Sequence, residues 1–321
     1  MMHRKTVGLV LGSGSSRGWA HIGTIEALKE ANIPIDFIAG CSVGAYVGAL
    51  YASGSMGSLK EFLLRMNGKK IFSYFDVVFP RSGLLNGARR VHELFSMHTG
   101  VQTFAELGIP LVMVATDLEL GEKVVINSGD IFEGLKATMS CPGLFAPVRV
   151  KDRWLVDGGL VDPVPVGVAR AMGAEIVIAV DLNSRIVSRS VQLPSSHQEK
   201  EKCLPSKTPN GSPDTRNELA QKMADYYENI ENSFKLKANE FLQREYPSPD
   251  IIETVMTSIG IMQERITRIN LAVDRPDILI QPRLGDLKMM NFDQVEHAIE
   301  EGYTGVQEKL EDIHTLLMEP P

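Results

Sequence analysis

Cysteine is scarce in this chain: only Cys41, Cys141 and Cys203 occur among 321 residues, far apart from one another. That spacing excludes a disulfide scaffold and a Cys/His metal cluster, and a sparse, odd count fits a reducing compartment. No apolar run approaches the ~20 residues of a membrane span, and the run Val7–Leu11 is too short for a signal peptide. The sequence therefore predicts a cytoplasmic protein without a metal site.

An excess of positive charge is also missing. The chain has 33 Lys and Arg against 40 Asp and Glu, a net charge of −7. This balance argues against a general nucleic-acid binder and makes electrostatic docking to anionic lipid a poor first explanation. A hydrophobic fraction of 44% and a charged fraction of 23% are ordinary for a globular protein that buries a core.

Short apolar runs alternate with helical spacing through the first half. Four almost continuously apolar runs predict strands buried on both faces, at residues 6–11, 37–39, 110–117 and 175–182. Apolar residues at helical spacing predict helices at residues 20–31 and 43–52. We therefore expect an α/β fold, with a mostly parallel central sheet covered by helices on both faces.

The character of the chain changes after residue 183. Residues 184–218 hold seven Ser, four Pro and no aromatic residue, so we expect a mobile insertion there. Residues 219–272 predict a helical segment, including a helix at 251–271, followed by a strand at 276–282 and a final helix at 291–318. Length alone suggests about two domains.

The sequence Gly40-Cys41-Ser42-Val43-Gly44 fits GxSxG and lies where a predicted strand gives way to a predicted helix. A nucleophilic serine at such a sharp turn needs small residues two positions before and after it. The alternative is a plain glycine-rich turn in which Ser42 caps the helix. The motif thus predicts either a nucleophile or a cap.

A second glycine-rich segment, residues 12–18, directly follows the first predicted strand. Its backbone amides can form a nest for an anion, either a phosphate or the oxyanion of an acyl intermediate. Arg17 stands where GxGxxG needs glycine, and no Walker triplet follows, so a nucleotide fits poorly. A simple connecting loop remains the alternative.

A nucleophilic serine needs a base, and no histidine is well placed to provide one. The histidines after Ser42 fall on predicted helices or in the polar insertion. Asp157, which is followed by Gly158 and Gly159, is the best carboxylate, although Asp-Gly often marks a hairpin turn.

Taken in order, these segments resemble the patatin-like phospholipase family, and most closely its bacterial branch, which is related to the neuropathy target esterase domain. The supporting sequences are Gly12–Gly18 with Ala20-His21-Ile22-Gly23, then Gly40–Gly44, Ala115-Thr116-Asp117, Cys141-Pro142-Gly143 and Asp157-Gly158-Gly159. The resemblance covers residues 6–183 well and 276–303 moderately.

The resemblance implies a patatin-like, acyltransferase/lysophospholipase-type fold with a helical C-terminal part. It implies a Ser–Asp dyad without histidine, with Ser42 as nucleophile and Asp157 as base. Gly12, Ser13 and Gly14 would supply oxyanion-hole amides, Gly40 and Gly44 would shape the nucleophile turn, and Gly158 and Gly159 the turn after the base. The implied reaction is hydrolysis of lipid acyl esters through an acyl-enzyme.

Two alternatives are an acyltransferase that uses the same dyad and a non-catalytic protein that binds lipid or nucleotide. No cofactor, metal or nucleic acid is expected; the expected partners are a lipid or ester substrate and, transiently, a membrane surface.

Because Ser42 and Asp157 must meet in one site, we expect a single domain over residues 1–321. An aromatic stretch at residues 71–79 suggests a lid or acyl groove, or plain core packing. The oligomeric state is left open, a homo-oligomer included.

Overall fold

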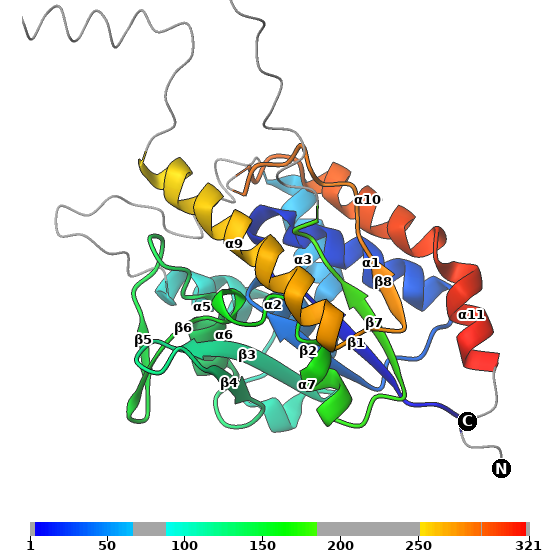
Figure 1. Ribbon diagram of the computed structural model, residues 1–321, viewed down its shortest axis with the longest axis horizontal. Coiled ribbons are helices and arrows are strands. Elements are labelled where there is room, and N and C mark those ends of the chain that lie inside the picture. The colour runs from blue at the N-terminus through cyan, green and yellow to red at the C-terminus, as the bar shows by residue number, and fades with distance from the viewer. Residues whose placement is uncertain (1–3, 67–87, 185–250, 290, 319–321) are drawn as a thin grey trace, which may run out of the picture. The chain divides into compact units, whose positions relative to one another are not determined.

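Strands and helices alternate along the chain as the sequence predicts. The computed structural model describes residues 4–66, 88–184, 251–289 and 291–318 (Figure 1). The predicted aromatic stretch at 71–79 lies outside these residues. So do most of the predicted insertion, 185–218, and the first part of the helical segment, 219–250.

Among the described residues the central sheet has eight strands: seven in the order β5-β6-β3-β2-β1-β7-β8, and β4, which also pairs with β3. The strands are β1 (Val7–Leu11), β2 (Phe37–Cys41), β3 (Leu111–Asp117), β4 (Lys123–Ile126), β5 (Val148–Val150), β6 (Arg153–Asp157), β7 (Ile176–Val180) and β8 (Ile278–Ile280). The five strands from β3 to β8 along this order pair in parallel, whereas β4, β5 and β6 pair antiparallel. The predicted mostly parallel sheet is confirmed, and the antiparallel strands were not predicted.

Helices cover both faces of the sheet. The α-helices are α1 (Ala20–Glu30), α2 (Val43–Ala52), α3 (Met56–Arg65), α5 (Ala88–His98), α6 (Ile131–Met139), α7 (Val166–Ala171), α9 (Ile251–Val273), α10 (Val295–Gln307) and α11 (Leu310–Met318). The described residues also include three short 3-10 turns between strands and helices: η1 (Ser15–Trp19), η2 (Phe104–Glu106) and η3 (Gly158–Leu160). Figure 1 shows α9 crossing in front of the strands.

The parallel strands have almost continuously apolar sequences because the core extends over both faces of the sheet. Along β1, Leu9 and Leu11 face a large cluster with α1, α2 and α10, while Val10 faces a second cluster with α7. Alternate side chains thus meet helices on opposite faces, and every residue of β1, β2, β3 and β7 is buried. The described residues of 4–184 and 252–318 form one compact unit.

The prediction of one final helix over 291–318 is wrong. The helical ladder breaks at residues 308 and 309, where the Lys309 amide donates to Val306 O, three residues back, at 2.9 Å. Two helices result, and both contribute to the core: α10 buries Val295, Ile299 and Val306 among others, and α11 buries Ile313. Among the described residues no helix combines the length and the apolar character needed to cross a bilayer.

Candidate active site

Ser42 lies between β2 and α2 in a backbone conformation that few residues adopt. Its φ is 54° and its ψ is −125°, outside the helical and extended regions. The turn is so tight that a β-carbon at Gly44 would collide with the backbone oxygen of Leu11, and one at Gly40 would press on the backbone of Ala45. Both glycines are therefore required by close backbone approach, and the interpretation of Ser42 as a mere helix cap fails: no capping bond from its side chain is present.

The register of the sheet brings Asp157 to Ser42. Strands β2 and β6 pair with the same edge of β3, one after the other. The pairing with β2 ends at Cys41, opposite Val114, and the pairing with β6 begins at the next residue of β3, with Asp157 opposite Ala115. The two strands must share this side because β4 occupies the other side of both positions. The ends of β2 and β6 therefore lie next to each other, which brings Asp157 to Ser42 across 115 positions of sequence.

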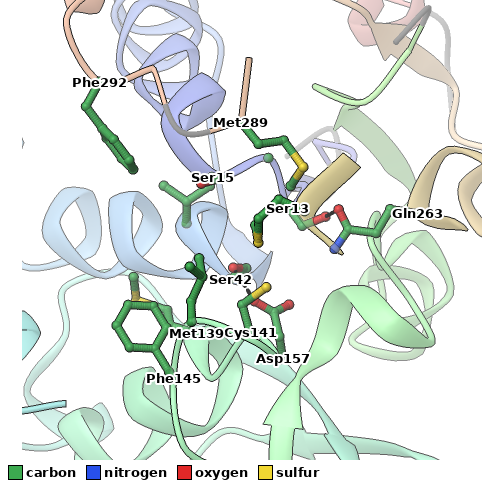
Figure 2. A pocket seen from close by; sticks show the side chains of 14 residues that line it. Ser13, Ser15, Ser42, Met139, Cys141, Phe145, Asp157, Gln263, Met289 and Phe292 are labelled. Atoms are coloured by element: carbon green, nitrogen blue, oxygen red, sulfur yellow. Dashed lines mark hydrogen bonds between the residues drawn. The ribbon is translucent and has the colours of Figure 1, made fainter. Parts of the chain in front are cut away.

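Ser42 Oγ donates a hydrogen bond of 2.6 Å to Asp157 Oδ2, and the Gly159 amide donates 2.8 Å to Asp157 Oδ1 (Figure 2). Asp157 is only 3% exposed. Burial raises the pKa of its carboxyl to about 6, although the bonds from Ser42 and Gly159 favour the charged form. The Asp-Gly pair is not a hairpin, because Gly158 begins η3, and a β-carbon there would collide with Val114 O.

A buried threonine, Thr138, fixes the turn at Ser42 through hydrogen bonds, and the sequence did not predict this role. The Ser42 amide donates to Thr138 Oγ1 at 2.9 Å, and that hydroxyl donates to Val114 O at 2.5 Å. Thr138 lies on α6 and is fully buried. A threonine within a helix gives no sequence signal of this role, since the contact depends on how α6 packs against β3.

The glycine-rich loop is anchored through the first two of the three amides predicted to hold an oxyanion. The Gly12 amide donates to Val180 O at 3.1 Å and the Ser13 amide to Pro163 O at 2.9 Å. The amides of Gly14 and Ser15 have no hydrogen-bond partner within the described part of the chain, and both residues line the pocket. The prediction for Gly12 and Ser13 thus needs correction: their amides hold the fold, and Gly14 and Ser15 carry the free donors.

Two buried side chains fix this loop. His21 Nε2 donates to Gly12 O at 2.8 Å, and burial lowers the pKa of its ring to about 4. Arg17 Nη1 donates to Leu182 O at 3.2 Å. The Arg17 side chain is 1% exposed, and burial lowers its pKa to about 10. Arg17 is therefore part of the interior rather than a surface charge or a contact for a substrate phosphate.

A pocket that is partly open to solvent lies above the Ser42–Asp157 pair. Besides the polar residues of the site, the pocket is lined by apolar side chains: Met139, Cys141, Leu144, Phe145, Met256, Met289 and Phe292. Figure 2 shows Ser42 and Asp157 at the base and Phe145, Phe292 and Met289 around the space. No histidine lines it within the described residues; His197 lies outside them. The lining from α9 and from Met289 and Phe292 was not predicted.

Cys41 and Cys141 lie close to this pair without free thiolates. Cys41 is fully buried, and burial, together with the Asp157 charge, raises the pKa of its thiol well above its usual value. Burial raises the pKa of Cys141 as well. No group of three or more His, Cys, Asp or Glu side chains with metal-binding geometry occurs in the described ranges.

The sequence profile of patatin-like phospholipases matches residues 9–170, which include the loop, the serine turn and Asp157. The chain belongs to the patatin-like phospholipase family. An uncharacterised NTE family protein of Mycobacterium tuberculosis is 36% identical over 177 residues, which are 55% of this chain and 49% of the relative. The chain thus spans about half the length of its mycobacterial relatives.

Two longer relatives match a similar share of the chain. Human patatin-like phospholipase domain-containing protein 6 is 33% identical over 189 residues, 56% of this chain but 14% of the relative. Lysophospholipase nte1 of Aspergillus fumigatus is 33% identical over 185 residues, 56% of this chain and 12% of the relative. The solved structure of VipD from Legionella pneumophila covers 96% of this chain and 67% of its own, with a TM-score of 0.47 and 13% identity.

Proposed function

We propose that this patatin-like chain hydrolyses lipid acyl esters with a Ser42–Asp157 dyad. The observation that carries the proposal is the 2.6 Å hydrogen bond between Ser42 Oγ and the buried Asp157 carboxylate, at the base of an apolar pocket. The serine is a poor nucleophile until a base accepts its proton, and Asp157 is the only carboxylate among the pocket-lining residues that the structure describes. The name of the fungal relative, a lysophospholipase, supports a single-chain phospholipid as substrate.

In the first half of the reaction, Asp157 Oδ2 accepts the hydroxyl proton as Ser42 Oγ forms a bond to the ester carbonyl carbon. The carbonyl oxygen becomes an oxyanion, and we assign its stabilisation to the backbone amides of Gly14, Ser15 and Val43, three residues that line the pocket. Collapse of this intermediate breaks the bond to the leaving alcohol, which takes the proton from Asp157. An acyl-Ser42 remains.

In the second half, Asp157 accepts a proton from water as the water oxygen attacks the acyl carbon. The fatty acid leaves, and Ser42 Oγ regains its proton. The apolar wall of the pocket suits an acyl chain, because burying its methylenes contributes roughly 0.8 kcal/mol each. The chemistry needs only side chains and amides of this chain.

For the location of the protein, we propose a cytoplasmic enzyme that contacts a membrane surface transiently to bind its lipid substrate. A lipid substrate and the scarcity of cysteine support it. Because the chain carries a net charge of −7, we do not expect electrostatic attraction to favour membranes of anionic lipid.

The test is release of fatty acid from lysophosphatidylcholine and from diacyl phosphatidylcholine by the purified full chain. Ser42→Ala and Asp157→Asn are expected to lower the rate by at least ~10²-fold, the usual contribution of a positioned base. Ser258→Ala removes an exposed serine of α9 and serves as the matched control. Full activity in Ser42→Ala, or no fatty acid from the wild type with either lipid, would overturn the proposal. Transfer of the acyl group to an alcohol with no free acid would assign an acyltransferase instead.

A further inference from the structure

Helix α9 directs one polar side chain, Gln263, toward the buried end of the pocket. The side chain is 3% exposed, and its neighbours on the same helix face, Met256, Ile259 and Thr267, are buried too. α9 lies beyond residues 9–170, so Gln263 falls outside the part of the chain that carries the family match. A buried amide in this place needs partners, and those partners belong to the catalytic segments.

At one end, the Gln263 amide oxygen contacts the glycine-rich loop. Gln263 Oε1 accepts from Ser13 Oγ at 3.4 Å and from Asn183 Nδ2 at 3.3 Å. Asn183 Nδ2 in turn donates to Ser13 O and to Ser13 Oγ, each at 3.2 Å. Asn183 is fully buried, and its backbone amide donates a hydrogen bond of 2.9 Å to Asp181 Oδ1. Ser13 immediately precedes the free amide of Gly14.

At the other end, the amide nitrogen lies against the turn that follows Asp157. A β-carbon at Gly159 would collide with Gln263 Nε2 and would lie 3.0 Å from Asp157 Oδ1. Gly159 is thus the residue at which the Gln263 amide and the Asp157 carboxylate come together. Figure 2 shows Gln263 reaching Ser13 through its oxygen, with its nitrogen turned toward the side of Asp157. One side chain therefore touches both halves of the candidate site.

The next residue of α9, Glu264, acts on the same loop through its charge. The negative charge of Glu264 favours the protonated form of the buried Arg17 guanidinium, as does that of Asp181. Arg17 follows the free amides of Gly14 and Ser15 in the loop.

We infer that Gln263 is a positioning residue that sets the oxyanion amides of Gly14 and Ser15 relative to Asp157. The inference rests on the proposed function, since it concerns the same reaction. Gln263 touches no reacting atom; it acts through Ser13 and through the turn at Gly159. Because catalysis depends on geometry, a shift of about 1 Å in such a contact can lower the rate by ~10²-fold.

The experiment compares Gln263→Met, which keeps an unbranched side chain of similar length, with Thr267→Val as its matched control. Thr267 lies one turn further along the same buried face, and its hydroxyl has no hydrogen-bond partner within the described part of the chain. For ester hydrolysis we expect kcat of Gln263→Met to fall roughly 10- to 100-fold with KM unchanged. Thr267→Val should keep the wild-type kcat and KM.

A double-mutant cycle with Ser13→Ala separates positioning from general loosening. Each single change should lower kcat, and the double variant should lose clearly less than the product of the two single losses, because both remove the same contact. If Gln263→Met does not fold, Gln263→Asn, which keeps the amide but shortens the reach, takes its place and should also lower kcat.

Wild-type kcat in the Gln263 variant, equal losses in Thr267→Val, or independent losses in the cycle would overturn the inference while leaving the hydrolase proposal intact. An inactive wild type would instead contradict the proposed function itself. The two failures are therefore distinguishable in one set of assays.

Discussion

Asp157 is buried beside the Ser42 hydroxyl, and this burial sets the pH range in which the pair can act. An ordinary aspartate is ionised above about pH 4, but burial raises the pKa of this carboxyl to about 6. A base must be unprotonated to accept the serine proton. The dyad therefore gains its active form only as the pH rises through about 6.

We predict that kcat/KM for a neutral ester falls tenfold per pH unit below about pH 6 and levels off above it. The measurement is a pH profile of ester hydrolysis between pH 4.5 and 8.5, a range chosen to bracket that value. A midpoint near the ordinary aspartate value, with no change around pH 6, would contradict burial as the dominant influence on Asp157.

The same raised pKa has a consequence for stability. Between the ordinary value of 3.8 and about 6, the folded chain holds a proton that the unfolded chain has lost, so the free energy of unfolding decreases as the pH rises. Above pH 6 the ionised carboxylate costs on the order of 2–3 kcal/mol, from the size of that shift. At pH 8 we expect Asp157→Asn to be inactive and yet to unfold at no lower temperature than the wild type, measured by thermal melting. A clearly lower midpoint would count against this account.

At the scale of single residues, the sequence predicts a site residue only where the residue types around it, such as the glycines of a tight turn, mark the position. Ser42 between two glycines and Asp157 before two glycines could be predicted, because tight turns demand glycine. Thr138 and Gln263 could not, since each lies on an ordinary helix and acquires its contacts only when that helix packs. Which amides of the loop stay free depends on the carbonyls that neighbouring segments present to it, here those of Val180 and Pro163, and a single sequence does not reveal this.

At the scale of elements, α1 and α10 approach each other so closely that their backbones touch through glycine. A β-carbon at Gly302 of α10 would collide with Ala20 O, and one at Gly23 of α1 would collide with Ile299 O. Thr24 Oγ1 also donates to Gly302 O at 3.2 Å. Because α1 begins just after η1, this contact supports the glycine-rich loop from the face opposite α9.

We predict that Gly302→Ala destabilises the fold by about 1–3 kcal/mol, since the added methyl must push two packed helices apart. The matched control is Gly57→Ala on α3, where no heavy atom lies within 4 Å of a built β-carbon. That change should stabilise by up to about 1 kcal/mol through helix propensity. Urea unfolding of both variants checks the pair. Equal effects would show that the α1–α10 contact is looser than described.

Helices and strands were predictable to different degrees for a physical reason. The buried parallel strands are marked by continuous apolar runs, and the amphipathic helix over 251–271 matches α9 (Ile251–Val273). The short antiparallel strands β4 and β5 carry weak alternation and are partly exposed, so composition does not distinguish them from loops. The break between α10 and α11 contains neither glycine nor proline, the residues that usually mark a helix end.

At the scale of the whole molecule, the site is assembled from distant parts of the chain. The loop follows β1, Ser42 follows β2, Asp157 ends β6, and Gln263 arrives on α9, after the segment 185–250 that lies outside the described residues. β8 joins the sheet beside β7 through the register of Ile178 with Ile278. We propose that the described residues before and after the segment 185–250 act as one domain, because the contacts of the candidate site span residues 13 to 263.

The most direct measurement of the central claim is intact-mass analysis of the full chain after reaction with a fluorophosphonate, followed by peptide mapping. We predict a single adduct on the Ser42 hydroxyl in the wild type, its formation slowed by at least ~10²-fold in Asp157→Asn and abolished in Ser42→Ala. An adduct on another residue, or labelling of Asp157→Asn at the wild-type rate, would contradict the Ser42–Asp157 dyad.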